Sequence, residues 1–209
     1  VLKPLKVVIE NFPEGKIEWL PALNNPNSDK QEQREIPFSR EIWIEQDDFM
    51  EEPSKKFFRL APGKEVRLRY AFFVTCNAVI KDEDGEIVEL RCSYDPETRG
   101  GNAPDGRKVK GTIHWVSAEH AEDAEIRIYN SFYNTPSPGR ERDFIEDINP
   151  NSLEVLENCK IEPDLITLDD NVPIQFERLG YFYKDPDTTP EKHIYNRTIS
   201  LRDTWNKKL

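Results

Sequence analysis

Apolar and charged residues alternate with a period of two in several short stretches of the chain, most regularly in residues 64–70. Three apolar residues alternate there with three charged ones: Val66, Leu68 and Tyr70 with Glu65, Arg67 and Arg69. A period of two is typical of a β-strand that buries one face and displays the other. We therefore expect Arg67 and Arg69 to project side by side from the displayed face.

Similar short stretches recur along the whole chain and are separated by turns rich in Gly, Pro and Asn. We expect further strands at residues 5–10, 16–20, 38–46, 71–80, 86–93, 112–117, 125–129, 153–161, 174–178, 181–183 and 194–205. Asp84-Gly85 between two of them predicts a hairpin. Residues 21–33 are expected to form an exposed loop, and residues 49–52 and 143–148 helical turns. The pattern predicts an all-β protein.

The length of 209 residues allows one large or two small domains with a real core. Residues 140–177 contain eleven acidic and three basic residues, a net charge of -8, which argues against RNA binding over most of this part. We expect two β modules. The proximal module comprises residues 1–112 and is completed by the returning segment 193–209, and the distal module comprises residues 113–192.

Positive charge is concentrated in residues 55–70, which carry six basic residues and one acidic residue in a chain of net charge -11. Phe57 and Phe58 lie among these cations, and a turn at Pro62-Gly63 can bring Arg59 back beside the strand. Guanidinium groups together with flat rings are what single-stranded nucleic acids bind. A solvated strand face above an aromatic core explains this stretch equally well.

The basic stretch at residues 94–111 is rich in Gly and Pro, and we expect it to be a mobile loop with exposed cations. These are Arg99, Arg107, Lys108 and Lys110. The loop lacks the GK[ST] ending of a phosphate-binding P-loop. Nucleic acid is repelled by the acidic chain as a whole, so binding must depend on a local basic face.

The remaining composition restricts the class of protein. The chain has no apolar run of membrane-spanning length and no signal peptide, and its only methionine is Met50, so we expect a soluble piece of a longer protein. Three cysteines without CxxC spacing argue against both disulfides and a zinc site. We expect a monomer in the reducing cytoplasm, without a metal site.

Four motifs together resemble one known family. They are KKFFRLAPGKEVRLRY at residues 55–70, DGRKVKGTIHWVS at 105–117, QFERLGYF at 175–182 and NRTISLRDTW at 196–205. In this order and spacing they are similar to the carboxy-terminal anticodon-binding region of glutaminyl-tRNA synthetases, over residues 6–205. Glutamyl-tRNA synthetases of the archaeal and eukaryotic type are similar here, and both belong to class I.

The resemblance implies two tandem β-barrels of the ribosomal protein L25-like type, which grip the splayed anticodon of glutamine tRNA. In this family a Rossmann domain with HIGH- and KMSKS-like motifs joins glutamine to tRNA with ATP and Mg²⁺. Neither motif occurs in these residues, so we expect a fragment that is inactive alone and holds no cofactor. Its partners would be the glutamine tRNA anticodon loop and the catalytic domain of the parent enzyme.

For the proximal barrel, the resemblance assigns Arg59 to the third anticodon base, a guanine, whose two acceptors suit a guanidinium fork. Arg67 and Arg69 match residues around the first anticodon base and its phosphates. Lys56 belongs to the same group, although some members have glutamine there, and Phe58 stands where some have lysine. Contacts to the third base are therefore expected to be redistributed in this chain.

For the distal barrel, the resemblance assigns Gln175 and Glu177, with Arg178 beside them, to the enclosure of the central uracil. The amide of glutamine both donates and accepts hydrogen bonds, which suits that base edge. Arg202 and Thr204 match the returning strand near the same nucleotides. A further family arginine lies upstream of Val1, so we expect this chain to bind tRNA more weakly than its parent.

Two other classes of function remain open from the sequence. One is a protein- or carbohydrate-binding β module that exposes Trp19 and Trp43. The other is a hydrolase that uses an acidic pair such as Glu146 and Asp147. No set of nucleophile, base and orienting residue is evident, and we expect no catalytic residue.

Overall fold

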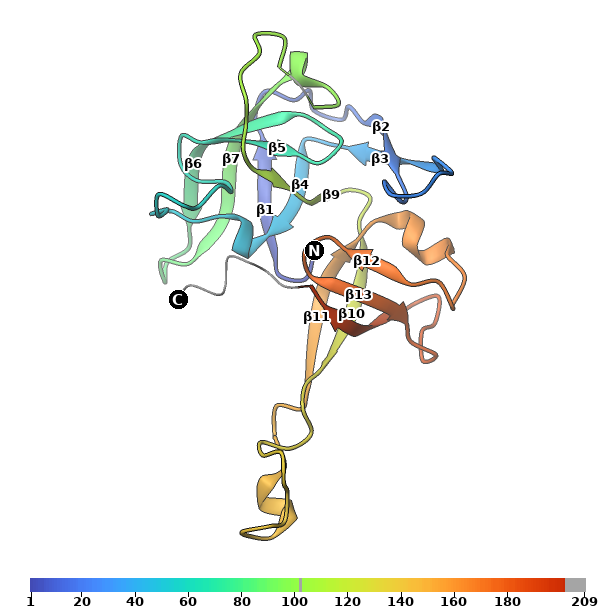
Figure 1. Cartoon of the computed structure of the whole chain (residues 1–209). Helices are drawn as coiled ribbons and strands as arrows, with labels where there is room; N and C mark the ends of the chain where they lie inside the picture. The colour runs from blue at the N-terminus through green and yellow to red at the C-terminus, as the bar shows by residue number, and fades with distance from the viewer. Residues whose placement is uncertain (102, 202–209) are drawn as a thin grey trace. The chain divides into compact units, whose positions relative to one another are not determined.

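The computed structural model describes residues 1–101 and 103–201. Within these residues the regular structure is β-strand, with a few short 3-10 turns, so the all-β prediction is confirmed (Figure 1). The chain divides into two compact units. The first unit is Val1–Glu122 with Lys160–Leu165, and the second is Asp123–Cys159 with the described residues from Ile166 onward.

A seven-stranded sheet forms the body of the first unit. Its order is β8-β5-β6-β7-β1-β4-β9. The strands are β1 (Pro4–Ile9), β4 (Glu41–Glu45), β5 (Glu65–Leu68), β6 (Phe73–Lys81), β7 (Ile87–Asp95), β8 (Thr112–Ile113) and β9 (Trp115–Ser117). Beside it, β2 (Glu18–Leu23) and β3 (Gln33–Phe38) pair as a separate antiparallel ribbon. The 3-10 turns of this part are η1 (Gln46–Asp48) and η2 (Pro96–Thr98).

The two outer strands of the seven-stranded sheet follow each other in sequence. β8 pairs with β5, where Thr112 lies opposite Arg67, and β9 pairs with β4, where Trp115 lies opposite Ile44. Only His114 separates β8 from β9. This short segment therefore joins both ends of the sheet and nearly closes it into a barrel, as the resemblance implied.

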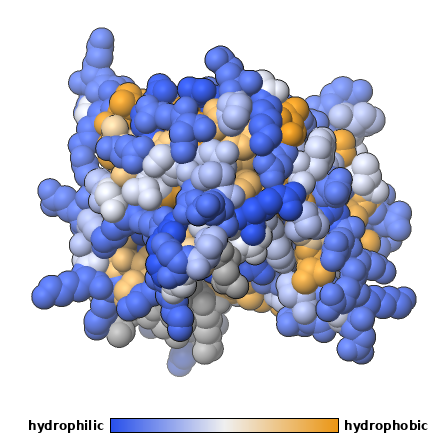
Figure 2. Space-filling model, turned by 90° about the horizontal axis from the view of Figure 1, so that it is seen from above, coloured by the Kyte–Doolittle hydropathy of each residue, from blue (hydrophilic) through white to orange (hydrophobic). Residues whose placement is uncertain are grey.

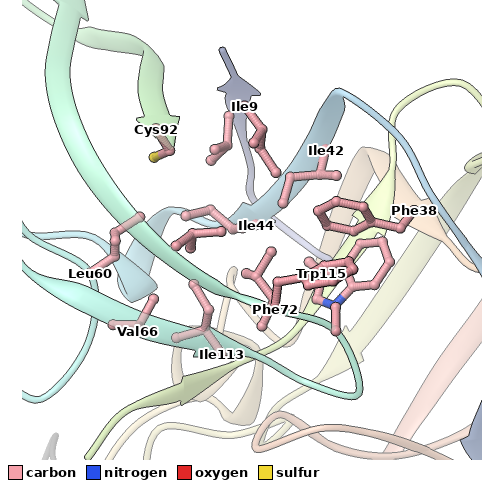
Figure 3. Close-up of a cluster of buried hydrophobic side chains, with 14 of the residues drawn as sticks. Ile9, Phe38, Ile42, Ile44, Leu60, Val66, Phe72, Cys92, Ile113 and Trp115 are labelled. Carbon is pink, nitrogen blue, oxygen red and sulfur yellow. The ribbon is translucent and has the colours of Figure 1, made fainter. Parts of the chain in front are cut away.

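The core of the first unit is built around aromatic rings that pack edge to face (Figure 3). The ring of Phe38 lies 5.0 Å from that of Phe12 and 5.1 Å from that of Trp115. The indole nitrogen of Trp115 also donates a hydrogen bond of 2.9 Å to the backbone oxygen of Arg69. The polar atom of this buried side chain is thereby satisfied.

Five strands form the sheet of the second unit, in the order β11-β10-β14-β13-β12. They are β10 (Glu122–Tyr129), β11 (Leu153–Ile161), β12 (Ile174–Phe176), β13 (Gly180–Lys184) and β14 (His193–Ser200). Residues 130–152 extend the β10–β11 pair into a long projecting hairpin, which contains η3 (Phe144–Asp147) (Figure 1). A further 3-10 turn, η4 (Pro163–Thr167), follows β11.

The core of the second unit is smaller and again aromatic. Phe176 and Phe182 stack with ring centroids 4.3 Å apart, and Tyr195 packs beside Phe176. Tyr195 is fully buried, and this burial raises the pKa of its hydroxyl to about 12. Desolvation disfavours the charged phenolate, so this tyrosine stays neutral over the physiological pH range.

The structure differs from the sequence predictions at several boundaries. The loop expected at residues 21–33 is shorter, because β2 continues to Leu23 and β3 begins at Gln33. The helical turn expected at residues 49–52 lies at η1 instead, and Phe49, the residue after η1, already has an extended backbone.

The pairing of β14 bears on one part of the predicted domain division. The segment 193–209 was expected to complete the proximal barrel, but its first residues form β14, which pairs with β10 and β13 of the second unit. Alternating burial within residues 193–200 does not specify which sheet they join. Residues 202–209 lie outside the described residues, and the division itself stays a prediction.

Two further features concern membranes and metals. The part of the chain described by the structure contains no helix with the length and apolar character needed to cross a membrane. The same residues contain no group of three His, Cys, Asp or Glu side chains arranged to hold a metal ion. Cys76, Cys92 and Cys159 are buried thiols.

We predict that Phe38→Ala lowers the free energy of unfolding by about 3–5 kcal/mol, because it removes a fully buried ring from the centre of the core. Urea unfolding followed by tryptophan fluorescence measures the effect, since Trp19, Trp43 and Trp115 lie in the first unit. Phe58→Ala is the matched control, because this phenylalanine is 51% exposed. The control is expected to change stability by less than about 0.5 kcal/mol.

Candidate nucleic-acid interface

The basic strand β5 displays Arg67 as the alternation predicts, because Val66 and Leu68 are buried and Arg67 is half-buried on the other face. The strand ends at Leu68, so Arg69 is half-buried in the turn that follows it and is not part of the strand. The guanidinium carbon of Arg67 lies 5.2 Å from the ring centroid of Phe73. The guanidinium carbon of Arg69 lies 5.1 Å from the ring of Tyr70. Contacts of this kind hold the cationic groups over aromatic faces.

Gly111 brings the segment before Arg59 against β5. A Cβ atom at position 111 would lie 1.8 Å from the carbonyl oxygen of Phe58, so only glycine fits there. On its other side, the carbonyl oxygen of Gly111 accepts a 2.9 Å hydrogen bond from the backbone nitrogen of Arg67. The segments of Phe58 and Arg67 therefore meet at Gly111, which is more than forty residues further along the chain.

Arg59 follows this contact directly and is held by the turn η1. Its Nη1 donates a 3.0 Å hydrogen bond to the backbone oxygen of Asp47, and its Nε lies 3.5 Å from Oδ1 of Asp48. The carboxylate of Asp48 is buried. Because a buried carboxylate requires a counter-charge, Arg59 has a structural role in addition to any role in binding.

Lysines around these arginines keep their charge exposed. Five of them are exposed and form no ion pair with any carboxylate of the described chain: Lys55, Lys56, Lys64, Lys108 and Lys110. Many other cations of the first unit are paired, as Lys6 is with Glu41 and Lys81 with Glu51. The surface around the start of β5 is therefore locally positive. We call these five lysines with Arg59, Arg67 and Arg69 the basic group.

Arg107 is more enclosed by acidic groups than the sequence suggested. Its guanidinium donates hydrogen bonds to the carboxylates of Glu65, Asp95 and Asp105. The bond to Glu65 is the largest of the contributions that raise the pKa of Arg107. The guanidinium in turn lowers the pKa of Asp95 below its ordinary value. Arg107 therefore stabilises the loop and adds little positive charge to the surface.

The candidate residues of the second unit lie on and after β12. Gln175 is exposed opposite Tyr181 of β13, and no described residue hydrogen-bonds to its amide. Glu177 and Arg178 form the tight turn into β13, where Arg178 has a φ of 65°. The amide of Gln175 is thus presented on a strand, with charged groups in the adjoining turn.

Gly180 places one more cation beside this turn. Its φ is 156°, and a Cβ atom there would lie 2.4 Å from the backbone oxygen of Ile199 and 3.3 Å from side-chain carbons of Arg197. Glycine therefore lets β14 approach β13 closely. The side chain of Arg197 consequently passes next to the hairpin that carries Gln175.

The structure brings the predicted residues into two groups, one in each unit. Lys56, Arg59, Arg67 and Arg69 lie in the first unit, whereas Gln175, Glu177 and Arg178 lie in the second unit. Arg202 and Thr204 lie outside the described residues.

One contact in this region was not foreseen. The ammonium nitrogen of Lys110 lies 5.0 Å from the ring centroid of the exposed Phe58. Both residues were noted in the sequence, but nothing in the pattern paired them. The only local signal is Gly111 next to Lys110, which allows a close backbone approach.

The structure gives the two other classes of function little support. Figure 2 shows a face on which hydrophilic side chains cover most of the surface and hydrophobic ones form small separate areas. Trp19 is exposed, but its ring contacts that of His120, and Trp43 is half-buried under Lys160.

The acidic pair proposed for a hydrolase is not arranged for acid–base chemistry. The carboxylate of Asp147 is buried and accepts hydrogen bonds from the backbone of Gly139 and from Arg142. These bonds lower its pKa, so it stays ionised, while Glu146 is exposed to solvent.

Comparison with known proteins covers both units. Two family profiles match, both described as tRNA synthetases class I (E and Q), anti-codon binding domain, at residues 1–95 and 112–185. The chain belongs to this family. The first match ends at the last residue of β7, and the second begins at the first residue of β8. Between them lies the loop that carries Arg107, Lys108 and Lys110.

Relatives match over nearly the whole chain. A glutamine–tRNA ligase of Bradyrhizobium diazoefficiens is 59% identical over 209 residues, or 100% of the chain and 37% of the relative. The corresponding enzyme of Nitrobacter winogradskyi is 56% identical over 99% of the chain and 37% of the relative. That of Aliivibrio salmonicida is 53% identical over 98% of the chain and 37% of the relative. The chain thus spans just over a third of the length of these relatives.

We predict that Gly111→Ala lowers the free energy of unfolding by about 1–3 kcal/mol, because the added methyl group collides with the carbonyl of Phe58. Urea unfolding followed by tryptophan fluorescence provides the measurement. Lys108→Ala serves as the control, since this exposed side chain lies in the same loop. Equal stability of the two variants would contradict the close approach at Gly111.

We predict that Arg107→Leu raises the pKa of Asp95 toward its ordinary value near 4. In the unsubstituted chain the pKa of the folded state is the lower one, so Asp95 stabilises the fold above about pH 4 and loses this effect as the pH falls through the folded-state pKa. The variant should therefore be less stable at pH 7, with a smaller loss on acidification below about pH 4. Carboxyl NMR titration measures the pKa of Asp95, and urea midpoints at pH 7 and below about pH 4 measure the stability. Lys108→Leu is the control.

Proposed function

We propose that the chain is the anticodon-binding part of a glutamine–tRNA ligase and binds the unpaired anticodon bases of glutamine tRNA. The observation that carries this proposal is the meeting of Phe58, Gly111 and Arg67 in a member of an anticodon-binding family, because it joins the three segments of the chain to which the basic group belongs. Exposed cations on a rigid barrel can neutralise phosphates, and arginine forks can pair with base edges.

In the first unit, we assign Arg59 to the third anticodon base. A guanidinium can donate two parallel hydrogen bonds to a guanine, and the contact of Arg59 with Asp47 already fixes its direction. Arg67 and Arg69 are assigned to the first base and its phosphates, with Lys56 supplying further charge. Their packing on Phe73 and Tyr70 reduces the entropy that binding must remove.

In the second unit, we assign Gln175 to the central uracil, with Glu177 and Arg178 beside it. The exposed amide can donate to and accept from the base edge at once. Arg202 and Thr204 are assigned to the same nucleotides from the family resemblance alone.

The chemistry of the parent enzyme would lie in the rest of its length. We infer that a separate catalytic domain joins glutamine to tRNA with ATP and Mg²⁺, and that this chain contributes the choice of tRNA. The parent would act as a monomer in the cytoplasm, where tRNA is charged.

We predict that Arg59→Ala weakens binding of a glutamine-tRNA anticodon stem-loop by roughly 1–3 kcal/mol and reduces discrimination at the third base. Arg59→Lys keeps the charge without the fork, so it should recover part of the affinity and little of the discrimination. Fluorescence anisotropy with stem-loops that differ only at the third base measures both quantities. Affinity of the unsubstituted chain should also fall steeply with added salt.

Arg91→Ala is the matched control, because it removes an arginine of the same unit that pairs with Glu89 on β7. Urea unfolding of each variant separates loss of binding from loss of the Asp48 contact. Equal binding of matched and mismatched stem-loops by the unsubstituted chain would refute the proposed function. Tighter binding of a glutamate-tRNA stem-loop than of the glutamine-tRNA one would indicate that the chain belongs to a glutamyl-tRNA synthetase.

A further inference from the structure

Phe58 is an aromatic side chain that the fold leaves in solvent. Its neighbour Phe57 is buried, whereas Phe58 is 51% exposed. A large apolar ring at a fixed surface position forgoes the stabilisation that burial gives. Single exposed rings are common, so exposure alone does not indicate a site. The surroundings of this ring distinguish it.

The backbone of Phe58 is held in place by its contact with Gly111. The carbonyl oxygen of Phe58 lies against Gly111, which in turn is hydrogen-bonded to Arg67 of β5. The close approach also places Lys110, the residue before Gly111, with its ammonium 5.0 Å from the ring centroid. The ring and the cation are thus presented together by two segments that meet beside β5.

The charge around the ring is positive. Lys56 precedes it by two residues and Arg59 follows it directly, and Lys55, Lys56 and Lys110 pair with no carboxylate of the described residues. An apolar ring among unneutralised lysines suits a ligand that is flat and negatively charged at once. A nucleotide has both properties, since its base stacks and its phosphate binds cations.

We propose that Phe58 is a stacking site for an unpaired base of the bound anticodon loop, next to the base at Arg59, and that Lys110 binds the phosphate of that nucleotide. The inference rests on the proposed function and adds to it a stacking residue, Phe58, and a specific phosphate contact for Lys110. The ammonium of Lys110 now lies over the ring where the base would stack, so the lysine would turn aside on binding. Its flexible four-carbon stem allows this movement.

An anticodon stem-loop with 2-aminopurine at one loop position at a time tests the stacking. The fluorescence of 2-aminopurine falls when it stacks, so one loop position should be quenched on binding. Phe58→Ala should abolish that quenching and weaken binding roughly 5- to 100-fold. Phe58→Trp should keep the affinity and increase the quenching at the same position. Phe58→Leu, which is apolar but not flat, should resemble Phe58→Ala.

The role of Lys110 has a separate readout. Lys110→Gln should lower the slope of log affinity against log salt by roughly 0.7, the value for one phosphate of a single strand. The matched controls are Lys30→Gln, an exposed lysine in the β2–β3 loop, and Phe132→Ala, an exposed phenylalanine of the second unit. Neither should change the salt slope or the quenching.

The outcomes separate this inference from the proposed function. If Phe58→Ala binds the stem-loop within twofold of the unsubstituted chain and quenches every position equally, the stacking site is refuted. In that case a loss of discrimination in Arg59→Ala would leave the proposed function intact. If the unsubstituted chain binds no anticodon stem-loop, both fail. A salt slope unchanged by Lys110→Gln would refute the phosphate contact alone.

Discussion

The pairing of residues 112–117 with two different strands is the interaction on which the first unit depends. β8 pairs with β5 and β9 with β4, so a single short segment joins both ends of the sheet. Near closure leaves little of the strand edge at which an open sheet would pair with other chains. The same segment positions the basic group, since Gly111 precedes it and Trp115 within it bonds to the backbone of Arg69. Barrel closure and the candidate interface are therefore specified together.

Local pairing of charges explains how a basic surface persists on an acidic protein. Arg107 and Arg99 are held by neighbouring carboxylates, whereas the lysines of the basic group have none among the described residues. At physiological ionic strength, electrostatic interactions are screened over about 8 Å. A phosphate close to the surface therefore responds to the nearby lysines more than to the net charge of -11. The acidic remainder limits contact with nucleic acid elsewhere.

The sequence predicted those features that arise from local patterns. Alternation placed β5 and the direction of Arg67, although the strand ends before Arg69, and Asp84-Gly85 marked the hairpin between β6 and β7. The features that it missed or left open depend on long-range contacts. Glu65 and Asp95 reach Arg107 from separate segments, and alternation within residues 193–200 does not specify the strands with which β14 pairs. The residues assigned to the site came from motif resemblance, because periodicity shows which side chains are displayed and not what they bind.

The second unit meets a different electrostatic problem, because residues 140–177 carry a net charge of -8. If the proposed function holds, a neutral amide suits recognition of a base in this unit better than a cationic side chain does. Gln175 needs no counter-charge, and once a bound base has displaced the surrounding water, its donor and acceptor would be satisfied together only by a base edge with the matching pattern. A mismatched base would leave polar groups of the amide or of the base without a hydrogen bond, and the resulting loss of binding free energy exceeds what a weak contact contributes. The lysines of the first unit would then supply most of the affinity, and Gln175 would contribute mainly to discrimination.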